Sequence, residues 1–316
     1  MTSTADAQPV AAGALVLGID VGGTSMKGAI TAADGAIVAR DTRATPRGAA
    51  ALDAVAALGE FLLDGLDAAQ RDRVVRGAVL LPGIVDAARG IAVFSGNIGW
   101  RDRDVSGLYA QRWGFPVLID HDVTAAGWAE WQFGAGAGHD DVCVVVLGTG
   151  VSGALAVGGR LVRGGSGQAG EYGHIVVRPD GRPCVCGNVG CLETVASAAA
   201  IGRRYAERAG IDTAGAADVF RALETDAVAR AVWDEAIDAL ADGLLGVIHA
   251  ACPELLVIAG GLSSAGPALT VPLQAALQQR VRVVAAPRVV LGRFGIDAGL
   301  VAAGQLARRG RESTIR

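Results

Sequence analysis

Short apolar runs separated by turn residues dominate the beginning of the chain. Residues 14–20 form an apolar run that ends in Asp20, and residues 26–31 and 36–40 form two further runs. A Gly-Gly-Thr turn follows the first run and an Ala-Asp-Gly turn follows the second. Runs of this length bounded by Gly and Asp predict strands joined by tight turns. We therefore expect a three-stranded meander, preceded by a flexible tail over residues 1–13.

The spacing then changes to that of a helix. Between residues 49 and 69, apolar residues recur every three or four positions, which predicts an amphipathic helix. Residues 74–81 and 117–120 are short apolar runs typical of buried strands, and residues 123–133 read as the helix after the second of them.

The second half of the chain repeats this layout. Strands are predicted over residues 141–147, 152–157 and 160–162, again joined by a glycine-threonine turn. Further along, the pattern predicts helices and strands over residues 216–251 (helical with interruptions), 255–259 (strand), 267–281 (helix), 288–291 (strand) and 298–308 (helix). Two meanders, each followed by helices and parallel strands, predict a two-lobed α/β protein with an interdomain cleft suited to a small molecule.

Composition and charge exclude several classes of protein. Apolar residues make up 51% of the 316 positions, so a packed globular protein is expected. The net charge is −4 and no basic tract occurs, which argues against binding to nucleic acid. Mean hydropathy is +0.39, but the longest uncharged stretch is broken by Gly and Pro, so no membrane span is predicted. The N-terminal segment is not typical of a signal peptide, and we expect a cytoplasmic location.

Three glycine motifs could bind a nucleotide. Asp20, Gly22, Gly23, Thr24 and Lys27 lie at the first turn, where bare backbone could meet phosphate oxygens and Asp20 could hold Mg²⁺ through water. Taken alone, this motif is more typical of a plain hairpin turn than of a phosphate-binding site. The other glycine positions are Gly148, Thr149 and Gly150 at the second turn, and Gly260 and Gly261 after the strand 255–259.

Gly148, Gly150 and Gly153 also spell the G-x-G-x-x-G fingerprint of dinucleotide-binding proteins. That fingerprint requires a helix next, and only four residues separate Gly153 from Gly158, so we expect no dinucleotide site here. The three glycine motifs in this order instead resemble those of the actin-like ATPase (ribonuclease H-like) fold that sugar kinases share with actin. The resemblance implies a small α/β lobe over residues 14–119 and 298–316, and a large α/β lobe over residues 120–297.

Three of the five cysteines lie within eight residues. Together with a nearby histidine they form a Cys₃His set, which closes a tetrahedral site and leaves no position for a metal-bound water. A zinc ion bound there would be structural. The candidate ligands are His174, Cys184, Cys186 and Cys191.

Residues 164–197 resemble the signature of the ROK family (repressor, open reading frame, kinase). The segment reads GGSGQAGEYGHIVVRPDGRPCVCGNVGCLETVAS, and the resemblance extends from Gly18 to about Gln305. Within the family the chain is most similar to the bacterial glucokinases. In such enzymes the histidine and the three cysteines bind structural zinc, and the large lobe would carry this zinc loop. The resemblance further implies that the sugar contacts Asn97, Glu171, His174 and Glu193.

The catalytic aspartate of the family falls at Asp122, directly after the strand 117–120. A carboxylate there could accept the proton of a sugar hydroxyl as it attacks the γ-phosphoryl group, although from the residues alone Asp122 could equally be a helix N-cap. Glucokinases usually have Asn before this aspartate, whereas this chain has His121. We expect His121 to bind the sugar and to influence which sugar is preferred.

The resemblance thus implies an ATP-dependent hexose kinase that uses Mg²⁺, carries structural Zn²⁺ and forms a homodimer. Glucose is the expected substrate. N-acylmannosamine, fructose and a C7-cyclitol stay open as alternatives, as does polyphosphate as the phosphoryl donor. Two other classes are a non-catalytic ROK sugar-sensing regulator and a DNA-binding repressor. Repressors of the family carry a helix-turn-helix domain first, and the first glycine turn at Gly22 leaves no room for one.

Overall fold

The computed structural model describes residues 8–48, 50–96 and 98–310. The chain forms two compact units. The first unit comprises the described parts of residues 1–129, 163–168 and 297–316, and the second comprises residues 130–162 and 169–296. The boundary after Ala129 differs from the predicted one before Asp120, because the strand that contains Asp120 pairs within the sheet of the first unit. Within the predicted tail, the N–H of Val10 donates to the carbonyl of Arg308.

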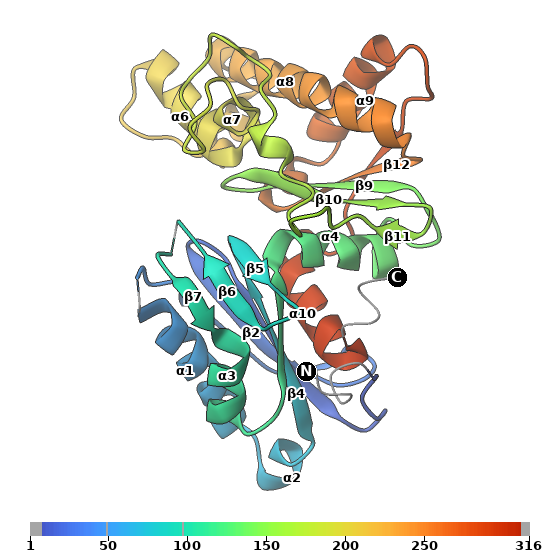
Figure 1. The fold of residues 1–316 in the computed structure, drawn as a ribbon. Coiled ribbons are helices and arrows are strands. Elements are labelled where there is room, and N and C mark those ends of the chain that lie inside the picture. The colour runs from blue at the N-terminus through green and yellow to red at the C-terminus, as the bar shows by residue number, and fades with distance from the viewer. Residues whose placement is uncertain (1–7, 49, 97, 311–316) are drawn as a thin grey trace. The chain divides into compact units, whose positions relative to one another are not determined.

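A five-stranded sheet forms the centre of the first unit (Figure 1). Its strands are β1 (Leu15–Val21), β2 (Ser25–Thr31), β3 (Ile37–Ala44), β4 (Val74–Leu81) and β8 (Val117–His121). They lie in the order β3-β2-β1-β4-β8. The first three strands of the chain are antiparallel, which confirms the predicted meander, and β1, β4 and β8 run parallel.

Different helices cover the two faces of β1. The helices are α1 (Ala50–Asp64), α3 (Val105–Trp113) and α10 (Ala298–Arg309). Leu17 and Ile19 belong to an apolar cluster with residues of α1 and α3. On the other face, Gly18 lies against α10, where an added Cβ would be 2.8 Å from the backbone N of Gly304. Because successive side chains of a strand point to opposite faces, β1 is buried on both sides.

The first unit also contains elements that the hydrophobic pattern does not indicate. They are α2 (Ala68–Arg71), a small antiparallel sheet of β5 (Ile84–Asp86), β6 (Ile91–Phe94) and β7 (Arg101–Asp104), and the helix α3. The predicted helix over residues 49–69 ends at Asp64, and Asp67 caps the separate turn α2. Helix α4 (Asp122–Phe133) begins one residue before its predicted start at Val123 and ends at the predicted residue.

The second unit repeats the sheet of the first. Its strands are β9 (Val142–Leu147), β10 (Val151–Val157), β11 (Arg160–Leu161), β12 (Leu255–Ala259) and β13 (Arg288–Leu291). Their order is β11-β10-β9-β12-β13, with the first three antiparallel and β9, β12 and β13 parallel. This duplication confirms the predicted fold class. Because β10 follows the Gly148–Gly150 turn where a dinucleotide site would need a helix, the G-x-G-x-x-G match is not such a site.

Helices pack around this second sheet and form its apolar core. They are α5 (Glu193–Ala196), α6 (Ala198–Ala209), α7 (Ala216–Ala222), α8 (Ala227–Ala251) and α9 (Pro267–Arg280), with the short 3₁₀ helices η2 (Tyr172–His174), η3 (Gly261–Ala265) and η4 (Gly295–Asp297). The interrupted helical region predicted over residues 216–251 consists of α7 and α8, and Asp226 caps the start of α8 by accepting from the N–H of Val228 and of Ala229.

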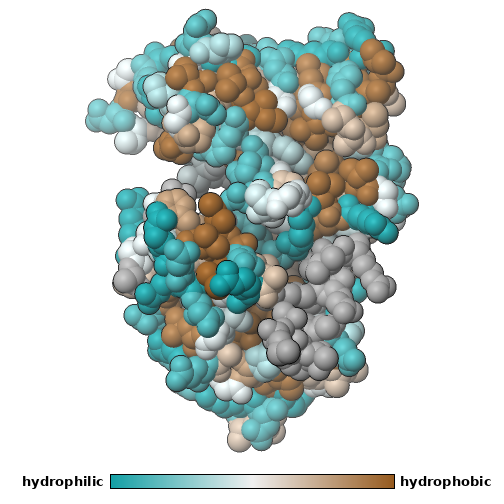
Figure 2. Space-filling view, viewed as in Figure 1, coloured by the Kyte–Doolittle hydropathy of each residue, from teal (hydrophilic) through white to brown (hydrophobic). Residues whose placement is uncertain are grey.

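None of the helices in the described residues is long and apolar enough to cross a membrane. The longest helix, α8, has 25 residues and carries charged side chains that include Arg230, Asp234 and Asp238. On the face drawn in Figure 2, hydrophobic and hydrophilic residues alternate over the surface of each unit.

Candidate active site and metal centre

The first glycine turn joins β1 to β2 and exposes its backbone. The N–H of Gly22 donates to the carbonyl of Ser25, and the Oγ1 of Thr45 donates to the carbonyl of Gly22. Gly23 and Thr24 are exposed, and an added Cβ on Gly23 would meet no atom within 4 Å. These two hydrogen bonds fix the base of the turn, while the backbone at its tip is not covered by side chains. A phosphate group can therefore approach this backbone closely.

Asp20 lies at the end of β1, beside charged residues of the same unit. Its strand partner is Lys27, whose Nζ is 3.5 Å from Oδ1 of Asp297. Arg40 donates two hydrogen bonds to Asp297, at 2.8 and 3.1 Å. Burial, together with the charge of Asp122, raises the pKa of Asp20 from 3.8 to about 7. A buried carboxylate whose pKa is raised by burial and by a nearby negative charge is a suitable hard oxygen donor for Mg²⁺.

Gly299 leaves the space that the Asp20 carboxylate occupies. An added Cβ on Gly299, in the first turn of α10, would lie 2.3 Å from Oδ2 of Asp20. Such a contact is impossible without moving the carboxylate or the helix. The positive end of the α10 helix dipole also favours the negative charge of the Asp20 carboxylate. Sequence reasoning did not identify Gly299 or Asp297, since both lie far from Asp20 in the chain.

Asp122 is the first residue of α4 and is partly buried, with 19% of its side chain exposed. Its Oδ1 accepts from the N–H of Val123 at 2.8 Å and lies 3.3 Å from Nε2 of His121. Burial raises the pKa of Asp122, whereas a positive charge on His121 would lower it. A carboxylate with a raised pKa at a strand end can accept a proton, as the sequence prediction requires.

His121 makes contacts to its own chain at both ring nitrogens. Nδ1 lies 3.0 Å from the Oγ1 of Thr124, and Nε2 faces Asp122. If the Thr124 hydroxyl donates to Nδ1, Nε2 carries the proton and faces Oδ1 of Asp122 at 3.3 Å. The imidazole therefore contacts the candidate base in this structure, and a bond from His121 to a sugar would have to replace or share one of these contacts.

Asp120, two residues before Asp122, is buried and paired in a way that the sequence did not suggest. Arg163 donates from Nη1 and Nη2 to its two carboxylate oxygens, at 3.0 and 2.7 Å. Asp120 also accepts from the N–H of His121 at 2.8 Å. A bidentate pair of this kind fixes both partners in direction as well as distance. Arg163 therefore stabilises the strand end that presents the candidate base.

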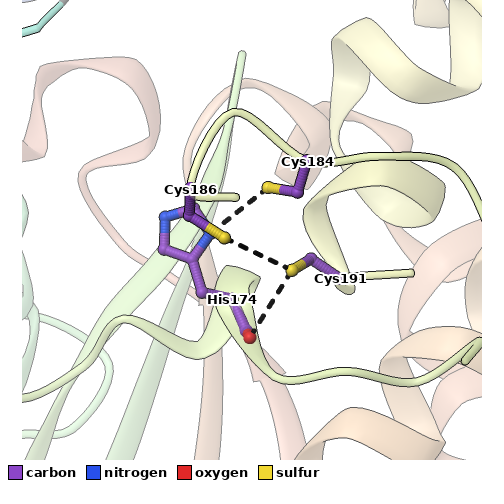
Figure 3. Close-up of side chains that lie close together, drawn as sticks. All are labelled: His174, Cys184, Cys186 and Cys191. Carbon is purple, nitrogen blue, oxygen red and sulfur yellow. Dashed lines mark hydrogen bonds between the residues drawn. The ribbon is translucent and has the colours of Figure 1, made fainter. Parts of the chain in front are cut away.

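The predicted zinc ligands come together in the second unit. Nδ1 of His174 and Sγ of Cys184 are 3.6 Å apart, as are the sulfurs of Cys186 and Cys191 (Figure 3). One ligand atom from each of the four residues lies within 4.8 Å of all the others. A tetrahedron with Zn–S bonds of about 2.3 Å has edges of about 3.8 Å, so the donor set and its spacing fit a zinc ion.

The loop that carries the cysteines is shaped for this cluster. The N–H of Cys184 donates to the carbonyl of Asn188, and an added Cβ on Gly190 would overlap the carbonyl of Arg178. Burial raises the pKa of the Cys191 thiol to about 12, while a backbone hydrogen bond at Asn188 lowers the pKa of Cys186. Since zinc binds thiolates, the ion would also stabilise the charged form of the buried Cys191.

The sugar-binding candidates of the second unit surround the zinc cluster and the second glycine turn. Nε2 of His174 is 3.8 Å from Oε2 of Glu171, so this nitrogen points away from the cluster. Oε2 of Glu193 accepts from the N–H of Val151 at 3.0 Å and would be 2.4 Å from an added Cβ on Gly150. Glu193 thus touches the Gly148–Gly150 turn, a link that the sequence did not indicate.

The remaining nucleotide candidates are also placed on open turns. Thr149 is exposed, and an added Cβ on Gly148 or on Gly261 would meet no atom within 4 Å. Gly260 has a φ of +82°, and a Cβ there would lie 2.5 Å from the carbonyl of Leu147. Only glycine fits that position without strain. The candidate sugar ligand Asn97 lies outside the described residues.

The chain was compared with known proteins. The model of the ROK family matches residues 16–309. A glucokinase of Thermotoga maritima is 33% identical over 308 residues, which cover 92% of this chain and 96% of that protein. An N-acetylmannosamine kinase of Yersinia pseudotuberculosis is 32% identical, with 92% and 98% covered. Among solved structures, a ROK family glucokinase from Streptomyces griseus in complex with glucose and AMPPNP has a TM-score of 0.83, 32% identity, and coverage of 93% and 99%.

Proposed function

We propose that the protein is a glucokinase that forms glucose 6-phosphate. The chain belongs to the ROK family, and its similarity to glucokinases over nearly its whole length supports an ATP-dependent hexose kinase. The observation that supports this most directly is the carboxylate of Asp122, partly buried at the end of β8 with a raised pKa. The glucokinase relatives are similar over nearly the whole chain.

In this proposal Asp122 accepts the proton of the 6-hydroxyl group of glucose as its oxygen attacks the γ-phosphoryl group in line. The raised pKa of Asp122 favours this role, because a more basic carboxylate takes the proton more readily. The N–H of Val123 and the imidazole of His121 hold the carboxylate in one orientation. Phosphoryl transfer depends mainly on positioning and charge neutralisation, so one base with correctly placed phosphates suffices.

The phosphates of ATP would be bound by the exposed backbone of the glycine turns. Gly23 and Thr24 in the first unit, and Gly148 and Thr149 in the second, present that backbone. Asp20 would hold Mg²⁺ through water; when bound, the ion neutralises charge on the phosphates. The role of Gly261 would be to leave room for the nucleoside.

The zinc ion would be structural in this proposal. His174, Cys184, Cys186 and Cys191 would supply all four ligands and leave no open position for water. The ion would fix the loop between Glu171 and Glu193, whose side chains would bind sugar hydroxyls together with Nε2 of His174. Asn97 and His121 complete the proposed sugar ligands.

N-acetylmannosamine is the second candidate substrate, because a kinase for that sugar is 32% identical over 304 residues. His121 in place of the asparagine that is usual in glucokinases gives a further reason to test it. A coupled assay of ADP release over hexoses, N-acylhexosamines and cyclitols, with a parallel arm that uses polyphosphate as donor, would decide. Highest kcat/KM on glucose with ATP supports the proposal, and highest kcat/KM on another acceptor contradicts it.

The role of Asp122 is tested by Asp122→Asn, which keeps the size of the side chain and removes the base. We expect kcat to fall by about 10²–10⁴-fold while glucose binding changes little. Asp104→Asn is the matched control, since Asp104 also begins a helix of the first unit and accepts from the N–H of Gly107. If Asp122→Asn retains more than about a tenth of the wild-type kcat with chemistry rate-limiting, Asp122 is not the base.

A further inference from the structure

A cavity of about 540 Å³ in the second unit is lined mainly by arginines. It lies between the segment Arg178–Arg182, which leads into the zinc loop, and helix α6, with α5 and α8 completing its walls. None of its lining residues has a part in the phosphoryl transfer proposed above. Its arginines are Arg178, Arg182, Arg203, Arg204 and Arg208, and its acidic residues are Asp180, Glu207 and Glu235.

Five guanidinium groups face three carboxylates, which leaves an excess of two positive charges in the cavity. Part of the positive charge is paired: Arg182 donates to Glu207 at 2.8 Å, and Arg208 donates two hydrogen bonds to Glu235, each of 2.8 Å. Arg204 also donates to Glu235. These pairs hold the cavity walls in place without cancelling the charge.

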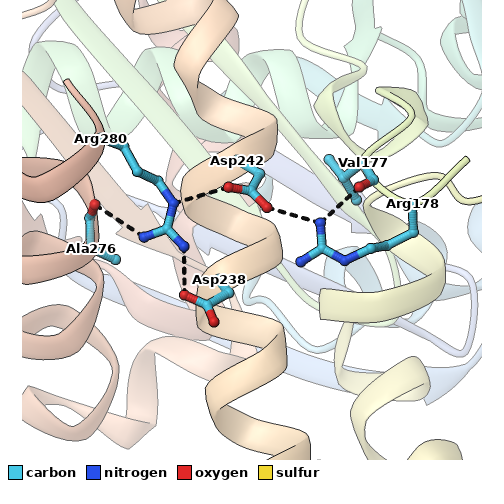
Figure 4. A network of polar contacts seen from close by, with 6 residues as sticks. All are labelled: Val177, Arg178, Asp238, Asp242, Ala276 and Arg280. Atoms are coloured by element: carbon cyan, nitrogen blue, oxygen red, sulfur yellow. Dashed lines mark hydrogen bonds and ion pairs between the residues drawn. The ribbon is translucent and has the colours of Figure 1, made fainter. Parts of the chain in front are cut away.

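Arg178 takes part in a network of polar contacts with Asp242 and Arg280, which are not lining residues of the cavity (Figure 4). Its Nη1 donates to the carbonyl of Val177 at 2.7 Å and to Asp242 at 2.8 Å. Asp242 also accepts from Nε of Arg280, which in turn donates to Asp238. Because Asp242 is anchored to a second arginine, the guanidinium of Arg178 is fixed in orientation before any ligand arrives.

Arg203 makes one hydrogen bond and one long ion pair. Its Nη2 donates to the carbonyl of Thr194 at 3.0 Å. Its Nε is buried and has no hydrogen-bond partner among the described residues, the paired carboxylate oxygen of Glu207 being 3.9 Å away. A buried donor of a charged group without an acceptor is costly, and a ligand that supplies an acceptor removes the cost.

We propose that this cavity binds a phosphate-bearing anion, with Arg203 and Arg182 as its main contacts. The lining contains more arginines than carboxylates, and the oxygens of a phosphate group suit the planar fork of guanidinium donors. The volume is in the range of small-molecule sites, so the phosphate could belong to a metabolite as well as to a free ion. Glu207 opposes binding, because its carboxylate competes for the same arginines.

Isothermal titration of the zinc-loaded full chain with inorganic phosphate, glucose 6-phosphate and tripolyphosphate tests this at fixed ionic strength. Arg203→Gln should weaken binding by about tenfold or more, because it removes a charged donor. Glu207→Gln should tighten binding, a gain that a misfolded protein could not show. Arg112→Gln is the control, since Arg112 pairs with Glu60 in the first unit and should leave the affinity unchanged.

The three ligands also identify the source of the phosphate. Equal binding of inorganic phosphate and the ester supports recognition of the phosphate group alone, whereas tighter binding of the ester or of tripolyphosphate supports a site for that larger anion. The proposal is overturned if none of the three binds the wild type below about 10 mM, or if Arg203→Gln and Glu207→Gln both leave the affinity unchanged. Because the proposed kinase site would also bind glucose 6-phosphate and tripolyphosphate, only the part of the affinity that Arg203→Gln and Glu207→Gln change is assigned to this cavity.

Discussion

Asp20→Asn should stabilise the magnesium-free protein at alkaline pH while it abolishes the use of Mg-ATP. Asparagine keeps the size of the side chain, so it fits the space beside Gly299 that an added Cβ could not share. It removes a carboxylate whose pKa is raised to about 7 by burial and by the charge of Asp122. The charged form of Asp20 therefore opposes folding in the absence of a cation.

The magnitude follows from the shift in pKa. For an acid whose pKa is raised from 3.8 to about 7 on folding, the stabilising contribution is present below the unfolded pKa and is lost as the pH rises through the folded one. The full loss is about 4 kcal/mol, at about 1.4 kcal/mol for each pKa unit. Between about pH 5 and about pH 8, the change is about 2.5 kcal/mol.

The assay is the free energy of unfolding by urea at these two pH values, without Mg²⁺, for the wild type and Asp20→Asn. As the pH rises, the free energy of unfolding of Asp20→Asn should increase relative to that of the wild type. Asp297→Asn is the control of opposite sign: although burial favours its neutral form, Arg40 and Lys27 hold the pKa of Asp297 below its usual range, so its loss should destabilise the protein at pH 8. Equal pH dependence of the wild type and Asp20→Asn would refute the argument.

Three further predictions concern the zinc cluster, the histidine and a glycine. Cys186→Ser should lose the zinc and lower both the melting temperature and the sugar affinity, as metal analysis, calorimetry and titration would show; no zinc in the freshly purified wild type would contradict the site. His121→Asn should keep or raise kcat/KM on glucose and remove an acid-side limb from its pH profile, and superimposed profiles would exclude His121 from the site. Gly299→Ala should displace Asp20 and raise the Mg²⁺ concentration needed for half-maximal rate, unlike Gly304→Ala, where a new Cβ would meet its nearest atom only at 3.4 Å.

The elements that the sequence predicts well are those whose pattern depends on burial alone. The strands β4, β12 and β13 have the predicted bounds, because each is a mostly apolar run between turn residues. In β4 and β12 nearly every residue is buried, whereas β13 is an edge strand that is only partly buried. The strand β7 is different: it reads Arg-Asp-Arg-Asp, is fully exposed, and owes its existence to pairing with β6. A strand of that kind has no apolar period to detect, so its position follows only from the partner.

In the candidate site, too, some residues can be identified from the local sequence and others only from the tertiary structure. The cysteines lie within one short segment and Asp20 ends an apolar strand, so local order along the chain was enough to indicate them. Asp122, the first residue of α4, was assigned its role through the family resemblance. The contacts that hold these groups join distant positions. Arg163 reaches Asp120 from a segment 43 residues later, and Glu193 accepts from the backbone of Val151, 42 residues earlier. A charged residue in a loop looks solvated in the sequence, and only the fold reveals which carboxylate it orients. Residues that act directly are therefore visible in a single sequence when they sit at element ends, whereas those that position them become visible only with the tertiary structure.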